Sequence, residues 1–461
     1  MGEKFLFATT GIRGSSNKQL TPEYCTAVGR AVASWKKHSV DRPNILLAMD
    51  TRISSPMIIT ALTAGLASEG IDITVLQEPI PTPELVFLTV RREYSMGIIV
   101  TGSHLPPSDN GIILIDGDGS YFKGTLETPD IYVPWDQLGH IEFIQNTWDS
   151  EWTRSYRNHL LKTIEGIKIE GKVLMDSVHG PMREYLYEVL SAIFSEVYTI
   201  NHEDDDYISG RPSEPKPETL GKTIEYLHSV KPELGIATDL DGDRVIFITD
   251  RGEVLPGDLV GAIFAIHSWK EHPEKEVVIP INTSAIIPTL AKQYGGKYFY
   301  TKVGAPSIIE GIKKRGAFYG FEETGKYFFN PDSLYPDGAF SSIVLLKIMY
   351  EEKKTLSEIA ESLPKFFALK TKTASNRKTA SKSFATILQN LDKLYSELPK
   401  NLVKESVSDI DGIRINFEDR SWILIRQSGT EDNLRVFTES MDEDLTKRMN
   451  EITLNFVREY L

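Results

Sequence analysis

The sharpest chemical signal in the sequence is a loop with three aspartates at alternate positions. Residues 239–244 read DLDGDR and lie between two apolar runs. Carboxylates two residues apart project to the same side of an extended backbone. Three anions gathered in this way repel one another unless a cation neutralises them, and oxygen-only ligands suit Mg²⁺. The spacing therefore predicts a magnesium site made by Asp239, Asp241 and Asp243, with a solvated acidic turn as the alternative.

A second loop places a serine and a histidine directly after a short apolar strand. Residues 101–111 read TGSHLPPSDNG and follow the run MGIIV. A strand end carries the next side chains to the edge of a sheet, and two prolines restrict the backbone that follows. We therefore expect Ser103 and His104 in a stiff loop, with the serine hydroxyl aimed into a cleft.

A third segment contains the residue types that bind phosphate. Residues 426–437, RQSGTEDNLRVF, place Ser-Gly-Thr in a turn between two strands, with an arginine on either side. Successive amides of such a turn form an anion-binding nest, hydroxyls add donors, and arginine can hold a phosphate with two bonds. The turn predicts a phosphate site, with a plain hairpin turn as the alternative. Its expected contacts are Arg426, Ser428, Gly429, Thr430 and Arg435.

A fourth loop has carboxylates next to a hydroxyl and an amine. Residues 316–329, GAFYGFEETGKYFF, bring Glu322, Glu323, Thr324 and Lys326 into one glycine-bounded loop. Such a set is suited to holding the vicinal hydroxyls of a sugar. A solvated loop is the alternative.

The elements that must position these loops alternate between strand and helix along most of the chain. Apolar runs separated by amphipathic helices indicate βαβ units with buried sheets. Strands are expected at 44–50, 71–78, 172–180 and 276–284, and helices at 55–70, 81–94, 181–194 and 285–296. The last hundred residues differ, because a helix at 382–398 precedes strands at 412–419, 421–429 and 434–440 and a final helix.

This pattern predicts three similar mixed-sheet α/β domains and a smaller α+β domain at the C-terminal end. Joins are expected within 145–152, 250–259 and 366–381. The expected domains are therefore 1–149 with the serine loop, 150–252 with the aspartate loop, 253–368 with the sugar loop, and 369–461 with the phosphate loop.

Composition bounds the class of protein. The 461 residues carry a formal charge of −14, which argues against a general nucleic-acid or membrane binder. Cys25 is the only cysteine, so no intrachain disulfide can form, as is typical of the cytoplasm. No targeting segment and no apolar run long enough to span a bilayer stands out.

Taken together, the loops resemble those of the α-D-phosphohexomutase family, which includes phosphoglucomutase/phosphomannomutase and phosphoglucosamine mutase. The resemblance covers nearly the whole chain, and the motifs occur in the family's order. They are TTGIRG (9–14), DTRISS (50–55), PTP (81–83), TGSHLPPSDNG (101–111), DLDGDR (239–244), GFEETGK (320–326), DGA (337–339) and RQSGTEDNLRVF (426–437). The resemblance implies four domains around a central cleft, a cytoplasmic enzyme that is a monomer or homodimer, and a small phosphosugar as substrate.

The resemblance also implies the roles of individual residues. Ser103 is expected to be the phosphoserine that donates and recovers the phosphoryl group, and to complete the Mg²⁺ site of the three aspartates. Arg13 and Arg244 match positions near the transferring phosphate, and His104 either shapes the loop or transfers a proton.

The implied reaction has two half-steps. A sugar 1-phosphate binds through the phosphate loop, Glu322 and Thr324 hold ring hydroxyls, and the phosphate of Ser103 passes to the 6-hydroxyl. The resulting sugar bisphosphate, which also serves as activator, turns around and returns its other phosphate to Ser103. The product is the sugar 6-phosphate.

The chain departs from the family pattern at several positions. Ile113 stands where a lysine is usual, and Lys326 stands where the sugar loop usually ends in histidine. A desolvated lysine near other cations can have a lowered pKa, so Lys326 is a candidate to take over proton transfer. The loop 301–307, TKVGAPS, aligns with the region that helps to set sugar preference, and it includes the small residue Gly304. The sequence does not choose between glucose, mannose, glucosamine and a pentose.

Two other functions fit parts of the sequence. DLDG after an apolar strand resembles the nucleophile loop of haloacid-dehalogenase-type phosphatases, in which Asp239 would be phosphorylated and Asp241 would be the acid. Against this, Asp243 replaces the expected threonine and the motif lies in mid-chain. A non-catalytic sugar-phosphate sensor on the same scaffold is the third hypothesis, motivated by Ile113.

Overall fold

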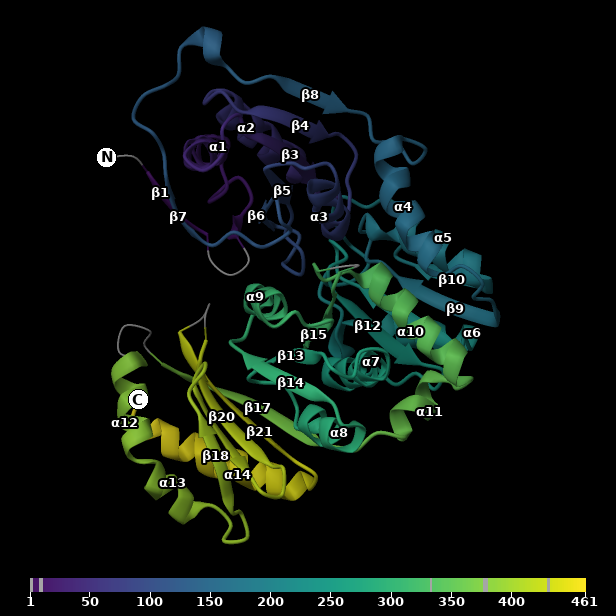
Figure 1. Cartoon of the computed structure of the whole chain (residues 1–461), viewed down its shortest axis with the longest axis vertical. Helices are drawn as coiled ribbons and strands as arrows, with labels where there is room; N and C mark the ends of the chain where they lie inside the picture. Colours follow the sequence, from purple (N-terminus) through teal and green to yellow (C-terminus); the bar gives the residue numbers. More distant parts are fainter. Residues whose placement is uncertain (1–2, 8–10, 332–333, 376–379, 429–431) are drawn as a thin grey trace. The chain divides into compact units, whose positions relative to one another are not determined.

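A computed structural model describes residues 3–7, 11–331, 334–375, 380–428 and 432–461. The chain forms two compact units (Figure 1). Unit 1 consists of residues 1–257 and 324–359, and unit 2 of residues 258–323 and 360–461.

The first sheet of unit 1 has six strands in the order β2–β6–β5–β3–β4–β8. The neighbours from β5 to β8 run parallel, whereas β6 is antiparallel to both β5 and β2. The strands are β2 (Ile12–Ser15), β3 (Asn44–Met49), β4 (Asp72–Leu76), β5 (Met96–Val100), β6 (Asp109–Asp116) and β8 (Ile141–Ile144). A separate ribbon joins β1 (Lys4–Phe7) and β7 (Gly124–Glu127).

Helices cover both faces of this sheet. The helices α1 (Pro22–Lys37) and α2 (Ser55–Ala67) pack on the face that carries Ile45, Leu47 and Ile98, while α3 (Thr82–Arg91) lies against β3 and β5. Buried parallel strands need cover on both sides, so the near-continuous apolar runs of β3, β4 and β5 are explained by this arrangement.

The second sheet of unit 1 carries the aspartate loop. Its order is β10–β9–β11–β12, in which β10, β9 and β11 are parallel and β12 is antiparallel to β11. The strands are β9 (Ile169–Asp176), β10 (Phe194–Ile200), β11 (Leu234–Thr238) and β12 (Val245–Thr249), with helices α4 (Glu151–Thr163), α5 (Met182–Ile193) and α6 (Gly221–Val230). After the chain returns from unit 2, β16 (Lys326–Phe329) and α10 (Gly338–Glu352) also belong to unit 1.

Unit 2 begins with a parallel sheet in which β13 (Glu276–Pro280) lies between β14 (Lys297–Thr301) and β15 (Tyr319–Glu322). Its helices are α7 (Gly257–Glu271), α8 (Ile286–Tyr294) and α9 (Ala305–Arg315). The helix α11 (Leu356–Glu361) leads into the C-terminal part of the chain.

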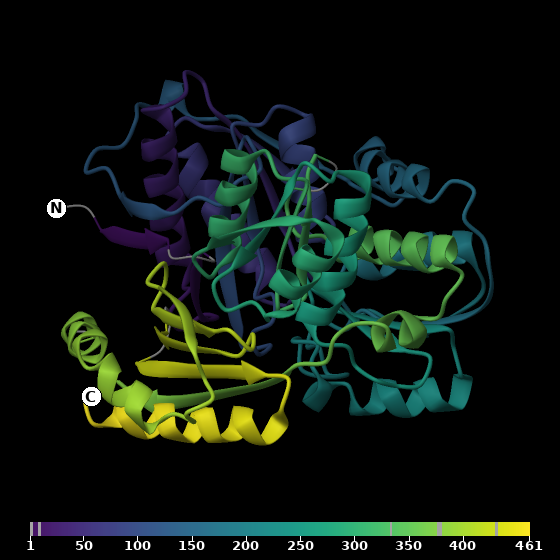
Figure 2. The same ribbon diagram turned by 60° about the horizontal axis from the view of Figure 1, so that its bottom comes forward.

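The C-terminal part of unit 2 is an antiparallel sheet with helices on one face. Its order is β17–β21–β20–β19–β18, and α14 runs along the sheet at the yellow end of the chain (Figure 2). The elements are β17 (Phe367–Ala374), α12 (Ala380–Gln389), α13 (Leu391–Glu397), β18 (Lys404–Ser408), β19 (Ile413–Phe417), β20 (Trp422–Gln427), β21 (Asn433–Ser440) and α14 (Glu443–Arg458). The mixed-sheet α/β class with a smaller α+β end is therefore confirmed.

Candidate active site

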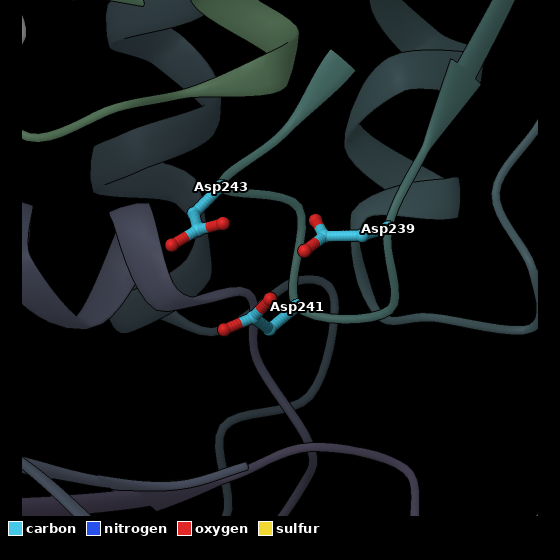
Figure 3. A group of neighbouring side chains, drawn as sticks. All are labelled: Asp239, Asp241 and Asp243. Atoms are coloured by element: carbon cyan, nitrogen blue, oxygen red, sulfur yellow. The ribbon is translucent and has the colours of Figure 1, made fainter. Parts of the chain in front are cut away.

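The three aspartates of the loop between β11 and β12 converge on one point (Figure 3). One carboxylate oxygen from each lies within 4.8 Å of the others, and all three side chains are buried. Gly242 allows the tight turn, because its φ of 73° is unfavourable for residues with a Cβ. Among the described residues, this is the one group of three or more acidic, histidine or cysteine side chains close enough to share a metal ion.

Some carboxylate oxygens of the three aspartates accept hydrogen bonds from protein donors, and others do not. Asp239 Oδ1 accepts from the Arg244 amide at 3.0 Å, and Asp241 Oδ2 accepts from Thr82 Oγ1 at 2.8 Å. Lys326 Nζ donates to Asp243 Oδ2 at 2.5 Å. Asp241 Oδ1 and Asp243 Oδ1 are buried without a hydrogen-bond partner among the described residues.

This donor set fits a hard divalent cation. Burial and the neighbouring carboxylates raise the pKa of Asp239 well above its usual value, as expected when anions are crowded without a cation. An ion between the three carboxylates would neutralise this repulsion. The two oxygens that lack a hydrogen-bond partner would then serve as its ligands. All-oxygen sites of this kind suit Mg²⁺.

Ser103 faces the aspartates directly. Its Oγ donates to Asp239 Oδ2 at 2.9 Å, across 136 residues of sequence, and the side chain is buried. The backbone of Ser103 has a φ of 48°, a left-handed conformation that costs a serine about 1–2 kcal/mol. The Ser103 amide donates to Thr101 Oγ1 at 2.8 Å, which offsets part of this strain and fixes the turn.

His104 is a neutral link between the serine and an arginine. Its Nδ1 lies 3.3 Å from Ser103 Oγ and accepts from Arg244 Nη2 at 3.1 Å. Burial, together with the positive charges of Arg244 and Arg13, lowers the pKa of His104 to about 2. The imidazole therefore carries no extra proton near neutral pH.

Two arginines border the aspartates. Arg244 donates to Glu214 Oε1 at 2.9 Å, and its Nε lies 3.8 Å from Asp239 Oδ2. Arg13 Nη1 donates to the Thr101 carbonyl at 2.8 Å. Burial lowers the pKa of Arg13, and the nearby charges of Asp241 and Asp243 oppose that shift.

Unit 1 thus brings together the expected residues Ser103, Arg13, His104, Arg244, Lys326 and the three aspartates. Thr324 begins the return of the chain to unit 1 and is exposed. The ion pair with Asp243 has a consequence for Lys326, because a carboxylate at 2.5 Å favours the charged ammonium. The amine of Lys326 therefore donates to Asp243, and its role in proton transfer stays a prediction.

The remaining expected residues lie in unit 2. Gly304, with φ 120°, precedes α9, and Glu322 is the buried last residue of β15. Arg426 and Arg435 are directly opposed on β20 and β21, and Arg426 Nε donates to Asp411 Oδ2 at 2.8 Å. The same carboxylate oxygen accepts a hydrogen bond from the Val303 amide at 3.0 Å. Asp411 therefore connects the loop 301–307 to Arg426 on β20.

Ser428 is buried, and its amide donates to the Asn433 carbonyl at 3.0 Å across the base of the phosphate turn. Gly429 and Thr430, like Thr9 and Thr10 of the first motif, lie outside the described residues.

Sequence reasoning missed several residues of this site. Thr82 holds Asp241 through both its amide and its hydroxyl, although PTP was noted only as a motif. Tyr121 and Tyr335 lie beside the aspartates, with ring centroids 4.9 Å apart and a tilt of 34° between the rings. Burial raises the pKa of both, and the charges of Asp243 and Asp241 add to the shift. Only the position of PTP at the start of an expected helix could have suggested Thr82, and no local signal marks the tyrosines.

In the part of the chain that the structure describes, no helix is both long and apolar enough to cross a membrane.

Comparisons with known proteins agree with this geometry. Family models described as phosphoglucomutase/phosphomannomutase match residues 4–131 (alpha/beta/alpha domain I), 154–252 (domain II), 256–367 (domain III) and 372–455 (C-terminal domain). The chain therefore belongs to the phosphoglucomutase/phosphomannomutase family of α-D-phosphohexomutases. It is a phosphosugar mutase, an isomerase of carbohydrate metabolism.

Individual relatives extend over the whole chain. A probable phosphoglucosamine mutase of Methanosarcina barkeri is 32% identical over 449 residues, which cover 95% of each chain. A phosphoglucomutase/phosphomannomutase of Thermococcus kodakarensis is 29% identical over 478 residues, 99% of each chain. The crystal structure of a family protein from Burkholderia thailandensis has the same fold, with a TM-score of 0.83 at 22% identity over 99% of this chain and 97% of that one.

Proposed function

We propose that the protein interconverts sugar 1-phosphates and sugar 6-phosphates through a phosphoserine at residue 103, with Mg²⁺ bound by Asp239, Asp241 and Asp243. The observation that carries the proposal is the 2.9 Å bond from Ser103 Oγ to Asp239 Oδ2 inside the buried aspartate cluster. A hydroxyl in that place can complete a metal site and bear the transferring group. When bound, Mg²⁺ would neutralise charge on the phosphoryl oxygens.

The first half-step transfers the phosphoryl group from Ser103 to the 6-hydroxyl of a bound sugar 1-phosphate. The bond between Ser103 Oγ and phosphorus breaks and a bond from sugar O6 to phosphorus forms. The proton of the 6-hydroxyl ends on Ser103 Oγ, which leaves as a free hydroxyl. Two cations, Arg13 and Arg244, lie near Ser103. They would stabilise the negative charge on the transferring group. Lys326 holds Asp243 and faces the same centre, so we assign it an electrostatic and substrate-binding role.

The second half-step runs the same chemistry in reverse on the other phosphate. The bisphosphate turns around, the phosphoryl group on O1 passes to Ser103 Oγ, and the 6-phosphate is released. In both orientations the phosphate that does not react is held by the phosphate loop, and ring hydroxyls contact Gly304, Glu322 and Thr324. The proposed phosphate contacts are Arg426, Ser428, Gly429, Thr430 and Arg435.

We further propose that the four domains span 1–149, 150–252, 253–368 and 369–461, close to the limits of the family matches. We expect a cytoplasmic enzyme that acts as a monomer or homodimer. Burial raises the pKa of the Cys25 thiol to about 12, so its one cysteine is not a reactive group.

A substrate panel tests the proposal. The 1-phosphates of glucose, mannose, glucosamine and a pentose are incubated with the protein, Mg²⁺ and a trace of the matching bisphosphate. The names of the relatives support a hexose or hexosamine, so we expect one of these to be converted to its 6-phosphate. Ser103→Ala should lower turnover at least about a thousandfold, because it removes the covalent intermediate.

The same panel separates the alternatives. Release of inorganic phosphate without isomerisation, retained by Ser103→Ala, would indicate a phosphatase with Asp239 as nucleophile. Binding without turnover of any sugar would indicate a sensor. Either result would contradict the proposed function.

A further inference from the structure

Arg52 is a buried charge that the proposed reaction does not use. It lies in DTRISS, between β3 and α2, with only 1% of its surface exposed. Burying an ionised guanidinium is unfavourable by several kcal/mol unless its donors are all bonded. The contacts around Arg52 show what the molecule gains in return.

All five N–H donors of the guanidinium have an acceptor, and four of these are carbonyl oxygens of the serine loop. Nε faces Asp50 Oδ2 at 3.3 Å. Nη1 donates to the carbonyls of Pro106 at 2.6 Å and Asp109 at 3.1 Å, and Nη2 to those of Ser103 at 2.9 Å and Leu105 at 2.8 Å. One planar group thus gathers the loop from Ser103 to Asp109 around itself.

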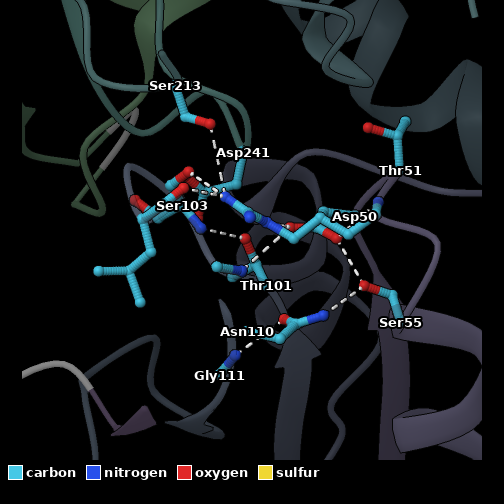
Figure 4. A network of polar contacts seen from close by, with 12 residues as sticks. Asp50, Thr51, Ser55, Thr101, Ser103, Asn110, Gly111, Ser213 and Asp241 are labelled. Atoms are coloured by element: carbon cyan, nitrogen blue, oxygen red, sulfur yellow. Dashed lines mark hydrogen bonds and ion pairs between the residues drawn. The ribbon is translucent and has the colours of Figure 1, made fainter. Parts of the chain in front are cut away.

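The surrounding side chains reinforce this arrangement (Figure 4). Asp50 Oδ2 also accepts from the Gly102 amide at 3.1 Å, and Asp50 Oδ1 accepts from Ser55 Oγ at 2.6 Å. Gly102 lets the loop approach closely, since a Cβ there would lie 2.4 Å from Arg52 Cζ. The left-handed backbone of Ser103 is therefore held from its carbonyl side by Arg52 and from its amide side by Thr101.

The residues on either side of Arg52 fasten it to the part of unit 1 that carries the aspartates. Thr51 Oγ1 donates to the His179 carbonyl at 3.1 Å, and the Ile53 amide donates to the Asp206 carbonyl at 3.2 Å. Segment 50–55 thus contacts the serine loop through the side chain of Arg52. It contacts the loops of the second sheet through Thr51 and Ile53.

We infer that Arg52 is a positioning residue that sets the hydroxyl of Ser103 at its distance from the aspartate cluster. It does not touch the reacting atoms. The inference rests on the proposed function, because the position of Ser103 matters only if Ser103 carries the phosphoryl group.

Arg52→Lys is the direct test. Lysine keeps the positive charge but has three donors and no planar fork, so at least two of the five acceptors, the four carbonyls and Asp50, lose their partner. A displacement of about 1 Å at a reacting group lowers the rate about a hundredfold. We therefore expect kcat to fall about a hundredfold, while KM for the sugar phosphate changes less than about threefold, since none of the proposed substrate contacts is altered.

Two further variants separate positioning from general stability. Gly102→Ala leaves Arg52 in the chain but pushes its guanidinium away, so it should reproduce the loss of kcat. Arg414→Lys is the matched control, because Arg414 is also fully buried and donates to backbone carbonyls, those of Ile281 and Thr283 in unit 2. It should lower thermal stability and leave kcat within about threefold of the wild type.

The outcomes are distinguishable. If the wild type carries no phosphate on Ser103, the proposed function fails. If the wild type is phosphorylated and active but Arg52→Lys keeps its kcat, or Arg414→Lys loses as much, the inference about Arg52 is overturned. If Arg52→Lys does not fold, Gly102→Ala decides, and a normal kcat in that variant overturns the inference.

Discussion

Asp241 and Asp243 each use one oxygen for a protein donor and leave the other without a hydrogen-bond partner among the described residues, whereas both oxygens of Asp239 accept hydrogen bonds. For Asp241 the donor is Thr82, which is fully buried at the first turn of α3. A hydrogen bond to a charged group contributes about 1.5–3 kcal/mol, and it fixes the rotamer as well. Thr82 therefore leaves Asp241 Oδ1 available to the proposed metal ion.

Thr82→Val tests this role, because valine has the same shape without the hydroxyl. We expect the Mg²⁺ concentration for half-maximal activity to rise about tenfold, the equivalent of losing one such bond. Thr89→Val is the control, since Thr89 is buried on the same helix but donates to the Leu85 carbonyl at 2.8 Å. An unchanged Mg²⁺ dependence in Thr82→Val would contradict the assignment.

At the scale of elements, the aspartate loop is held by three neighbours. The amide of Thr82 at the start of α3 donates to the Asp241 carbonyl at 2.9 Å, and the amide of Gly338 at the start of α10 donates to the Gly242 carbonyl at 2.9 Å. The loop after β9 approaches from the third side, where a Cβ on Gly180 would lie 2.0 Å from the Leu240 carbonyl. The loop conformation therefore depends on packing as well as on its own sequence.

Gly180→Ala should displace the loop, since the obstacle is backbone that cannot rotate away. We expect a loss of about 1–3 kcal/mol in the free energy of unfolding and weaker Mg²⁺ binding, measured by denaturant unfolding and calorimetry. Gly221→Ala is the control, because nothing lies within 4 Å of a Cβ at this first residue of α6. That variant should be neutral or more stable by up to about 1 kcal/mol. Equal behaviour of the two variants would contradict this account of the loop.

The elements themselves were predictable where their pattern is strong. The buried runs of β3, β4 and β9 and the helices between them follow from apolar runs and helical periodicity. The segment 366–381, expected as a join between domains, also contains the strand β17, which was not expected. This strand was missed because it lies at a sheet edge with its side chains mostly exposed or half-buried, so its sequence FALKTKTA is polar.

Spacing alone predicts the site only where its residues are close in sequence, whereas Ser103, Arg13, His104, Arg244 and Lys326 were expected from the family resemblance. Asp239, Asp241 and Asp243 share one loop, so their spacing indicates a cation site directly. Thr82 at the start of α3 lies 159 residues from its partner Asp241, and Lys326 at the start of β16 lies 83 residues from its partner Asp243. Such contacts depend on how the sheets pack, which local spacing does not encode.

At the scale of the whole chain, buried bonds fasten the two sheets of unit 1 to each other. Tyr185 on α5 donates to Glu84 Oε2 on α3 at 2.6 Å, and Tyr156 on α4 donates to Asp337 Oδ2 at the cap of α10 at 2.7 Å. In unit 2, Glu439 on β21 connects the C-terminal sheet to the start of α8. It accepts hydrogen bonds from the Ala285 amide and from Trp422 Nε1.

Glu84 makes the stability of the protein depend on pH. Burial raises its pKa from the usual 4.5 to about 8, opposed by the bond from Tyr185. Between these values the folded state holds one more proton than the unfolded state, so this group's stabilisation is full below pH 4.5 and is lost as pH rises toward 8. The slope is at most about 1.4 kcal/mol per pH unit.

Glu84→Gln keeps an oxygen for Tyr185 and removes the titration. The free energy of unfolding of this variant, relative to the wild type, should therefore increase from pH 5 to pH 8, as measured by urea unfolding at each pH. A difference that stays constant across this range would contradict the buried, protonated state of Glu84.

The most direct test of the central claim is to find where the protein carries phosphate. The protein is incubated with a sugar 1,6-bisphosphate labelled in its phosphates, digested, and its labelled peptide is identified by mass spectrometry. The account predicts an acid-stable label on Ser103 that resists hydroxylamine and passes to unlabelled sugar phosphate. A hydroxylamine-sensitive label on Asp239, or no label on Ser103 in an active protein, would contradict it.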